Sequence, residues 1–306
     1  MINYYQRSIK DAQIKDLKDY QVGSLILVSS PSEKELDSLA EKFKLERDLL
    51  SDALDPYEVP RMEVEKNAIY AFARIPSEDG RRTSTLPLLL IVGDGFLMLV
   101  AQKDLDFLFK DLRRRPDFFT TQRTKCFLQI FGEIQADYHH MLTKINKKIN
   151  YFSLNMDKIN DKDIANFVNF EIILNEFLSA LLPIRHILSN TSSGKTLSFY
   201  HDDEEILEDL RLHNDQLVER CKSNLTNSTN LRQAYEVIST NRLNRTMKLL
   251  TAMTVVLALP TMVTSFYGMN VSLPFAGSPQ VFWGILGLIL FLVGLLLMAF
   301  RGRKLL

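Results

Sequence analysis

The sequence lacks several features that would point to an enzyme or to a secreted protein. Its 306 residues include only two cysteines, Cys126 and Cys221, too few for a disulfide framework or a cysteine-rich metal cluster. Lysine plus arginine and aspartate plus glutamate both number 37, so no excess of positive charge favours nucleic acid as a partner. The sequence shows no phosphate-binding glycine loop and no nucleophile motif. The composition therefore predicts neither an enzyme nor an organic cofactor.

Charge is missing altogether from residues 249–300, which contain no Asp, Glu, Lys, Arg or His. Two apolar stretches lie there, at 249–266 and 281–300, and each is long enough to cross a hydrocarbon core of roughly 30 Å. The segment 267–280 between them contains Gly268, Pro274, Gly277 and Pro279, which indicates a loop. The sequence thus predicts a two-helix membrane hairpin, for which a plain membrane anchor is the simplest explanation.

Basic residues flank the hairpin on one side only. Arg242, Arg245 and Lys248 precede the first stretch, Arg301, Arg303 and Lys304 follow the second, and the loop between has none. The positive-inside rule then places both chain ends in the cytoplasm and the loop outside. We therefore expect a multi-pass protein of the cell membrane with a large cytoplasmic part.

The first stretch is more polar than an anchor helix needs to be. At helical spacing, seven residues fall within one sector about 100° wide, and all of them except Met247 are small or polar: Asn244, Met247, Thr251, Thr254, Ala258, Thr261 and Ser265. Polar faces of membrane helices point at a partner helix or at a water-filled cavity. Helix packing and pore lining both explain this face, and pore lining requires an oligomer because two helices cannot enclose a pore.

Residues 1–110 alternate strand and helix signals. Apolar runs bounded by Gly, Pro or Asp predict strands at 24–29, 68–75, 86–92 and 96–101, with a hairpin turn at 93–95. Ser30 or Ser32 is expected to cap a helix that starts near Pro31. Helical periodicity begins after Asp117, and a second helix is predicted at about 162–188.

The motifs near the membrane resemble those of the CorA family of magnesium transporters. The sequence has Asn244, Met247-Lys248, Leu250-Thr251, an internal Pro260, and then Tyr267-Gly268-Met269-Asn270, in the order and spacing of the family's N-x-x-M-K-x-L-T and Y-G-M-N motifs. Looser similarity covers 50–55, 59–65 and 182–185. Since the motifs carry about eight matched positions, the resemblance is specific.

The resemblance implies a homopentamer in which an α/β funnel domain leads through a long stalk helix to a two-helix transmembrane hairpin. The corresponding segments are a cytoplasmic α/β domain (1–115), a helical pair (116–195), the stalk (196–248), the pore helix (249–266), the external loop (267–280), the second transmembrane helix (281–300) and a basic tail (301–306). Residues 224–230 have poor helix propensity and look locally like a loop. The resemblance instead implies that they are helical.

The resemblance also implies roles for individual residues. Asn270 would present a ring of amide oxygens suited to hydrated magnesium, while Gly268 permits a tight turn that Tyr267 and Met269 hold by packing. The first helix would line the pore with Asn244, Met247, Leu250, Thr251, Thr254, Ala258, Thr261 and Ser265. Met247 and Leu250 would form its apolar gate.

Regulation in the family implies a second role for magnesium, as an inhibitor bound between cytoplasmic domains. The aligned carboxylates are Asp52 and Asp209, and ordinary solvated acids are the alternative interpretation of both. Two such carboxylates repel unless a cation bridges them, so cation occupancy biases the interface.

Three positions depart from the family pattern. The external loop 271–280 has no acidic residue, Ser51 stands where an acid often precedes Asp52, and Ala258 replaces a bulkier pore residue. The predicted function is gated, passive uptake of magnesium or related divalent cations across a lipid bilayer. A zinc, cobalt or nickel transporter of the same family is the first alternative, and a membrane-anchored signalling or scaffold protein is the second.

Overall fold

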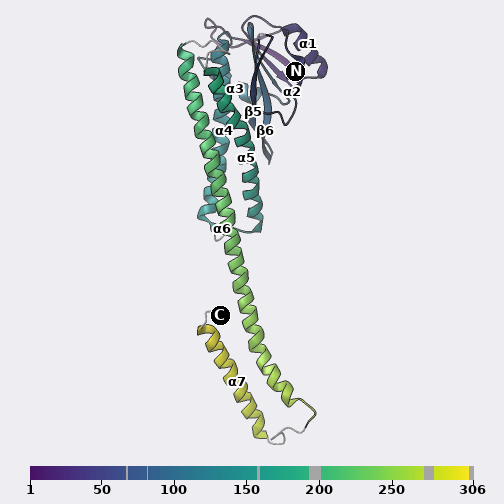
Figure 1. The fold of residues 1–306 in the computed structure, drawn as a ribbon, viewed down its shortest axis with the longest axis vertical. Helices are drawn as coiled ribbons and strands as arrows, with labels where there is room; N and C mark the ends of the chain where they lie inside the picture. The colour runs from purple at the N-terminus through teal and green to yellow at the C-terminus, as the bar shows by residue number, and fades with distance from the viewer. Residues whose placement is uncertain (67, 81, 157–158, 193–200, 272–278, 303–306) are drawn as a thin grey trace. The chain divides into compact units, whose positions relative to one another are not determined.

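The computed structural model describes residues 1–66, 68–80, 82–156, 159–192, 201–271 and 279–302. The chain divides into two compact units, Met1–Leu231 and Arg232–Leu306, which share the long helix α6 (His201–Tyr267). Figure 1 gives the element labels used below.

A seven-stranded sheet forms the centre of the first unit. Its order is β2-β1-β3-β7-β6-β5-β4. The strands are β1 (Ile2–Gln6), β2 (Lys15–Leu17), β3 (Ser24–Ser29), β4 (Arg61–Glu65), β5 (Ala68–Asp79), β6 (Arg82–Gly93) and β7 (Phe96–Ala101). Only β3 and β7 pair in parallel, with Ile26 opposite Met98, and the other described pairs are antiparallel. The apolar β3 and β7 lie centrally because helices cover both of their faces.

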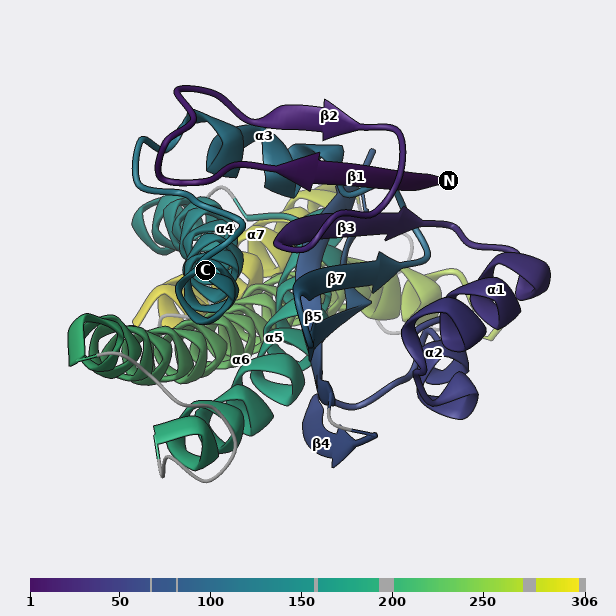
Figure 2. The same cartoon turned by 90° about the horizontal axis from the view of Figure 1, so that it is seen from above.

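Two short helices cover one face of the sheet, as Figure 2 shows. They are α1 (Glu33–Phe43) and α2 (Arg47–Asp52), whose leucines pack against alternate residues of the central strands. Ser32, one of the two predicted capping residues, caps α1 through a capping box with Glu35. Ser30, the other candidate, has a positive φ of 46°.

Three long helices pack together on the opposite face of the sheet. The short α3 (Asp106–Arg114) precedes them, and α4 (Arg123–Leu154) and α5 (Asp161–Ser192) contact β5 and β6. The first part of α6 joins α4 and α5 through buried positions spaced alternately four and three residues apart: Asp203, Leu207, Leu210, Asn214, Leu217, Cys221, Asn224, Ser228 and Leu231. Such spacing is typical of a helix that keeps one face against its neighbours.

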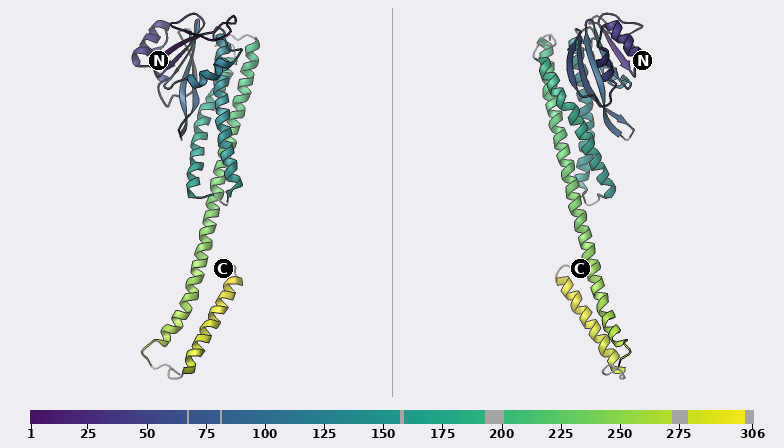
Figure 3. Two further views of the ribbon diagram at one scale, coloured as in Figure 1. Left: turned by 180° about the vertical axis from the view of Figure 1, so that it is seen from behind. Right: turned by 45° about the vertical axis from the view of Figure 1, so that its right-hand side comes forward.

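The second unit contains the rest of α6 and the apolar helix α7 (Pro279–Gly302), which runs in the opposite direction (Figure 3). By length and composition three helical segments could span a membrane: Asp163–Ser189 in α5, Asp203–Tyr267 in α6, and Phe282–Gly302 in α7. The sequence predicted only the last two. In α5, 44% of the apolar window is buried inside the first unit, against 6% in α6 and 0% in α7. Nearly half of this window therefore already packs inside this unit.

Several predictions are confirmed and others were incomplete. β3 and β7 have the predicted bounds, β5 and β6 are longer than predicted, and β1, β2, β4, α2 and α3 were not predicted. Residues 224–230 are helical, as the resemblance implied and local propensity did not. The helix predicted to start near 196 is described from His201, and residues 193–200 lie outside the described part.

Candidate functional site

The eight residues predicted to line a pore all lie on the last turns of α6, and every one of them is exposed in the single chain. The less exposed positions of this segment are Ala252, Val256, Leu259, Pro260 and Val263. At helical spacing these five fall roughly opposite the polar sector. Within this unit, the apolar side of α6 is therefore the covered side, and the polar side is left without a cover.

The second apolar helix has a similar sidedness. Four of its less exposed positions, Ile285, Ile289, Leu292 and Leu296, recur every three or four residues and so share one side of α7. The remaining side chains of α7 are mostly exposed and apolar, including Trp283, Leu290 and Phe291. A helix that is apolar all round suits a lipid environment.

The threonines on α6 bind the backbone of their own helix. Thr251, Thr254 and Thr261 each donate a hydroxyl hydrogen bond of 2.9 Å to the carbonyl four residues earlier. Such bonds satisfy a hydroxyl inside an apolar medium without a second helix. Since each hydroxyl has already donated its hydrogen, the threonine oxygen can only accept further hydrogen bonds.

The sequence Tyr267–Asn270 lies where α6 ends. The amide of Gly268 donates to the carbonyls of Thr264 at 3.0 Å and Ser265 at 3.2 Å. A Cβ at Gly268 would meet the Thr264 carbonyl oxygen at 3.4 Å, which is an ordinary contact, and the φ of Gly268 is not in the left-handed region, so the described single chain does not itself require glycine here. Tyr267 and Met269 are exposed in the single chain, so the packing role predicted for them stays a prediction.

Asn270 follows in a bend and is also exposed. Residues 272–278 of the acid-free loop after it lie outside the described part, and the last two residues of the predicted loop, 279–280, belong to α7. The amide of Asn270 is thus displayed at the end of the helix whose polar side was described above.

Asp52, the first predicted regulatory carboxylate, ends helix α2 and already has a cation beside it. Its Oδ2 accepts a hydrogen bond from Arg61 Nη2 at 2.7 Å. Arg61 also pairs with Glu58 and Glu63, and its guanidinium lies 4.1 Å from the centre of the Phe72 ring. One guanidinium therefore serves three carboxylates, which leaves this cluster with a net charge of −2.

Asp209, the second predicted carboxylate, is exposed on α6. No contact within the described part of the chain brings it to Asp52, and no group of three metal-ligating side chains occurs among the described residues. A metal site made from Asp52 and Asp209 therefore needs a second subunit.

Sequence reasoning missed Arg61 as a partner of Asp52. The signal was present, because Arg61 lies between Glu58 and Glu63 at spacings that place all three near one strand start. What the sequence did not show is that β4 turns back toward the end of α2.

Comparison with known proteins identifies the family of this chain. Residues 25–303 match the family described as CorA-like Mg²⁺ transporter protein. The cobalt/magnesium transport protein CorA of Methanocaldococcus jannaschii is 23% identical over 284 residues, covering 89% of this chain and 87% of that protein.

Two solved structures share the fold across almost the whole chain. The complete structure of the CorA magnesium transporter from M. jannaschii gives a TM-score of 0.84 at 21% identity, covering 98% of this chain and 97% of that one. The full-length CmaX protein gives 0.76 at 17% identity, covering 99% and 97%. The soluble α/β domain, the long helix and the C-terminal apolar helices are thus the fold of a full-length transporter of this kind. The chain belongs to the family of CorA-like Mg²⁺ transporter proteins and is a transporter of divalent cations, not an enzyme.

Proposed function

We propose that this chain forms a homopentameric, gated pathway for the passive uptake of Mg²⁺, with the polar side of α6 facing the pathway. Five copies would enclose it between their α6 helices, with α7 outside toward lipid. Both chain ends would be cytoplasmic, and Asn270 would form a ring at the outer mouth. A divalent ion gains about 4.6 kcal/mol per 100 mV on entering a negative cell interior, so no chemical fuel is needed.

The observation that carries this proposal is the sidedness of α6. A polar side that packed against α7 would be the covered side, yet the covered positions, such as Ala252 and Val256, are apolar and lie opposite. An uncovered polar side inside a membrane needs either another copy of the chain or water.

The chemistry of the uncovered side suits a hydrated magnesium ion. Magnesium sheds its water reluctantly, and its bound waters point their hydrogens outward. The outward oxygens of Thr251, Thr254 and Thr261 have already donated their own hydrogens and can only accept. They therefore match the outer surface of a hydrated cation without stripping it.

Metal-resolved flux into proteoliposomes tests the proposal. Wild-type protein should admit Mg²⁺, and Asn270→Ala should abolish most of that flux while the protein stays folded and pentameric by cross-linking. Asn241→Ala is the matched control, because Asn241 is an exposed asparagine on α6 that lies outside the polar sector.

A membrane-anchored scaffold makes the opposite prediction. It expects no flux, a silent Asn270→Ala variant and no fixed pentamer in detergent. A monomer or dimer by cross-linking would therefore contradict the pathway.

Another divalent ion is the second candidate, because the loop after Asn270 carries no acidic residue to concentrate Mg²⁺. The M. jannaschii relative is itself described as a cobalt/magnesium transport protein. Flux of cobalt, nickel or zinc without flux of Mg²⁺ would assign this chain to transition-metal transport.

Regulation would use Asp52 of one subunit and Asp209 of its neighbour. Mg²⁺ bound between them would hold the closed state when internal Mg²⁺ is high. The double variant Asp52→Asn with Asp209→Asn should keep conducting at internal Mg²⁺ that closes the wild type, and unchanged inhibition would reject this site.

A further inference from the structure

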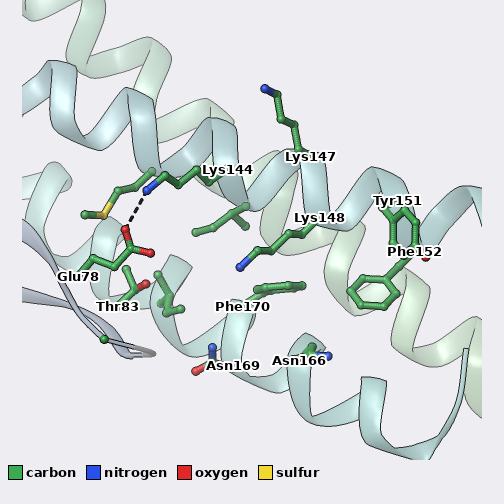
Figure 4. A pocket seen from close by; sticks show the side chains of 14 residues that line it. Glu78, Thr83, Lys144, Lys147, Lys148, Tyr151, Phe152, Asn166, Asn169 and Phe170 are labelled. Carbon is green, nitrogen blue, oxygen red and sulfur yellow. Dashed lines mark hydrogen bonds and ion pairs between the residues drawn. The ribbon is translucent and has the colours of Figure 1, made fainter.

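A groove of about 690 Å³ lies in the first unit, far along the chain from any residue assigned above. Three elements line it: the end of the β5–β6 hairpin, the last turns of α4 and the first turns of α5 (Figure 4). Its volume is within the range of sites for organic small molecules. The transport proposal gives this groove no role.

The groove has an excess of positive charge. Its lining contains Lys144, Lys147 and Lys148 from α4, and its only acidic residue is Glu78. Lys144 pairs with Glu78 at 2.8 Å, whereas neither Lys147 nor Lys148 forms an ion pair in the described part of the chain. Figure 4 shows Lys147 pointing away from the other lining side chains and Lys148 extending toward the α5 side. Lys148 is thus the available cation.

One end of the groove is aromatic. Phe152 packs against Phe167 with ring centres 5.1 Å apart and lies 6.4 Å from Phe170, so this wall is held in place. Tyr151 lies beside Phe152 at 5.7 Å but is 63% exposed. An exposed aromatic ring next to a fixed one offers a stacking surface for a planar ligand.

Hydrogen-bonding side chains lie between the cations and the aromatic end. Asn166 and Asn169 are three residues apart on α5 and both are exposed along the groove. Their amides carry donors and acceptors, and Thr83 on the hairpin adds a hydroxyl. This combination can form hydrogen bonds with the edge of a heterocyclic base or with the hydroxyls of a sugar.

We propose that this groove binds a nucleotide, with its phosphates at Lys148 and Lys144 and its base against Tyr151. Inorganic polyphosphate would use only the lysines, and a nucleoside without phosphate would use only the aromatic end. A nucleotide uses both ends and the amides between them. This proposal is independent of transport, because it concerns binding to the first unit.

Equilibrium binding to the purified full-length protein tests it, with ATP, tripolyphosphate and adenosine as separate probes at near-physiological salt. ATP should bind more tightly than either fragment. Lys148→Gln should weaken ATP binding by about tenfold, the loss expected for one charge-assisted contact. Lys34→Gln, an exposed lysine on α1, is the matched control and should leave ATP binding unchanged.

A second variant tests the binding of the base separately from the binding of the phosphates. Tyr151→Ala should weaken ATP but leave tripolyphosphate unchanged, and its exposure means the fold should survive, as thermal unfolding would check. Equal affinity for ATP and tripolyphosphate would overturn the proposal, as would ATP binding that both variants leave intact. Failure of transport would not affect this result.

Discussion

Arg61 Nη2 and Asp52 Oδ2 lie 2.7 Å apart, so the aspartate proposed as a regulatory metal ligand already has a cationic partner within its own subunit. A metal ion bound at Asp52 must compete with this guanidinium. The strength of inhibition by internal Mg²⁺ should therefore depend on Arg61 as well as on the two aspartates.

Arg61→Gln should make the transporter close at lower internal Mg²⁺. The change leaves Asp52, Glu58 and Glu63 without their shared cation and so favours a divalent ion. The half-inhibiting Mg²⁺ concentration in a flux assay should fall about fivefold, as expected for a partly exposed pair. Arg47→Gln is the control, because Arg47 pairs similarly with Glu33 and Asp37 on α1. An unchanged or higher half-inhibiting concentration would show that Arg61 does not weaken Mg²⁺ inhibition.

Thr261→Val should reduce Mg²⁺ flux several-fold, because it replaces an acceptor oxygen on the polar side of α6 by a methyl group. Thr264→Val is a close control: Thr264 makes the same kind of bond, to Pro260 at 2.9 Å, but lies outside the polar sector. Proteoliposome flux should distinguish the two variants. An equal loss of flux in both variants would mean that the hydroxyls support the helix backbone and do not contact the ion in the pathway.

Asp137→Asn should stabilise the first unit most at neutral pH. Burial, then the charges of Glu133 and Asp111, raise the pKa of Asp137 from 3.8 to about 6. Ionising it in the folded state is therefore unfavourable, and stability present at low pH is lost as pH rises through about 6. The melting temperature should rise by about 2–4 °C at pH 7.5, and by less at pH 5.

Asp94→Asn, in the exposed β6–β7 turn, provides the comparison for that experiment. It should show no such pH-dependent gain. A gain for Asp137→Asn that is larger at pH 5 than at pH 7.5 would contradict the sign of the shift.

Asn214 gives a stability prediction in the helical part of the first unit. It is fully buried and donates to the Leu181 carbonyl at 3.1 Å, while its own oxygen has no partner among the described residues. Asn214→Leu fills the same space without a polar atom and should change the free energy of unfolding by less than about 1 kcal/mol. Asn214→Ala leaves a cavity and should cost about 2 kcal/mol. If denaturant unfolding shows that the leucine variant loses as much stability as the alanine variant, the amide of Asn214 contributes more than the volume that it fills.

Much of the fold could be predicted where local pattern and tertiary environment agree. β3 and β7 are continuous apolar runs between turn residues, and they form the buried centre of the sheet. β1 and β2 were missed because their strands are mixed in polarity and gain their structure from pairing, as Tyr4 does with Ile26. Such pairing between distant segments leaves little local signal.

Residues 224–230 show the opposite situation. Their side chains favour turns in isolation, yet Asn224 and Ser228 are buried on the side of α6 that faces α4 and α5. Ser228 donates to the Phe167 carbonyl at 3.3 Å, so the bundle supplies the partner that a turn would otherwise supply. Tertiary packing therefore overrides propensity here.

The candidate site was predictable to a similar degree. The polar side of α6 follows from spacing alone, and its motif identified the family. The sequence does not show which side of α6 is covered, or that Arg61 forms an ion pair with Asp52. Both depend on contacts between segments far apart in the sequence.

The bonds that the α6 threonines make to their own backbone have a consequence for charge selection. The waters around a cation direct both hydrogens outward, whereas each water around an anion spends one hydrogen on the ion and presents its oxygen and a single hydrogen outward. Along Thr251, Thr254 and Thr261 the hydroxyl hydrogens are already donated, so these side chains offer nothing to the outward oxygens of an anion's shell. A pathway lined in this way would favour cations over chloride or phosphate while carrying no charge of its own.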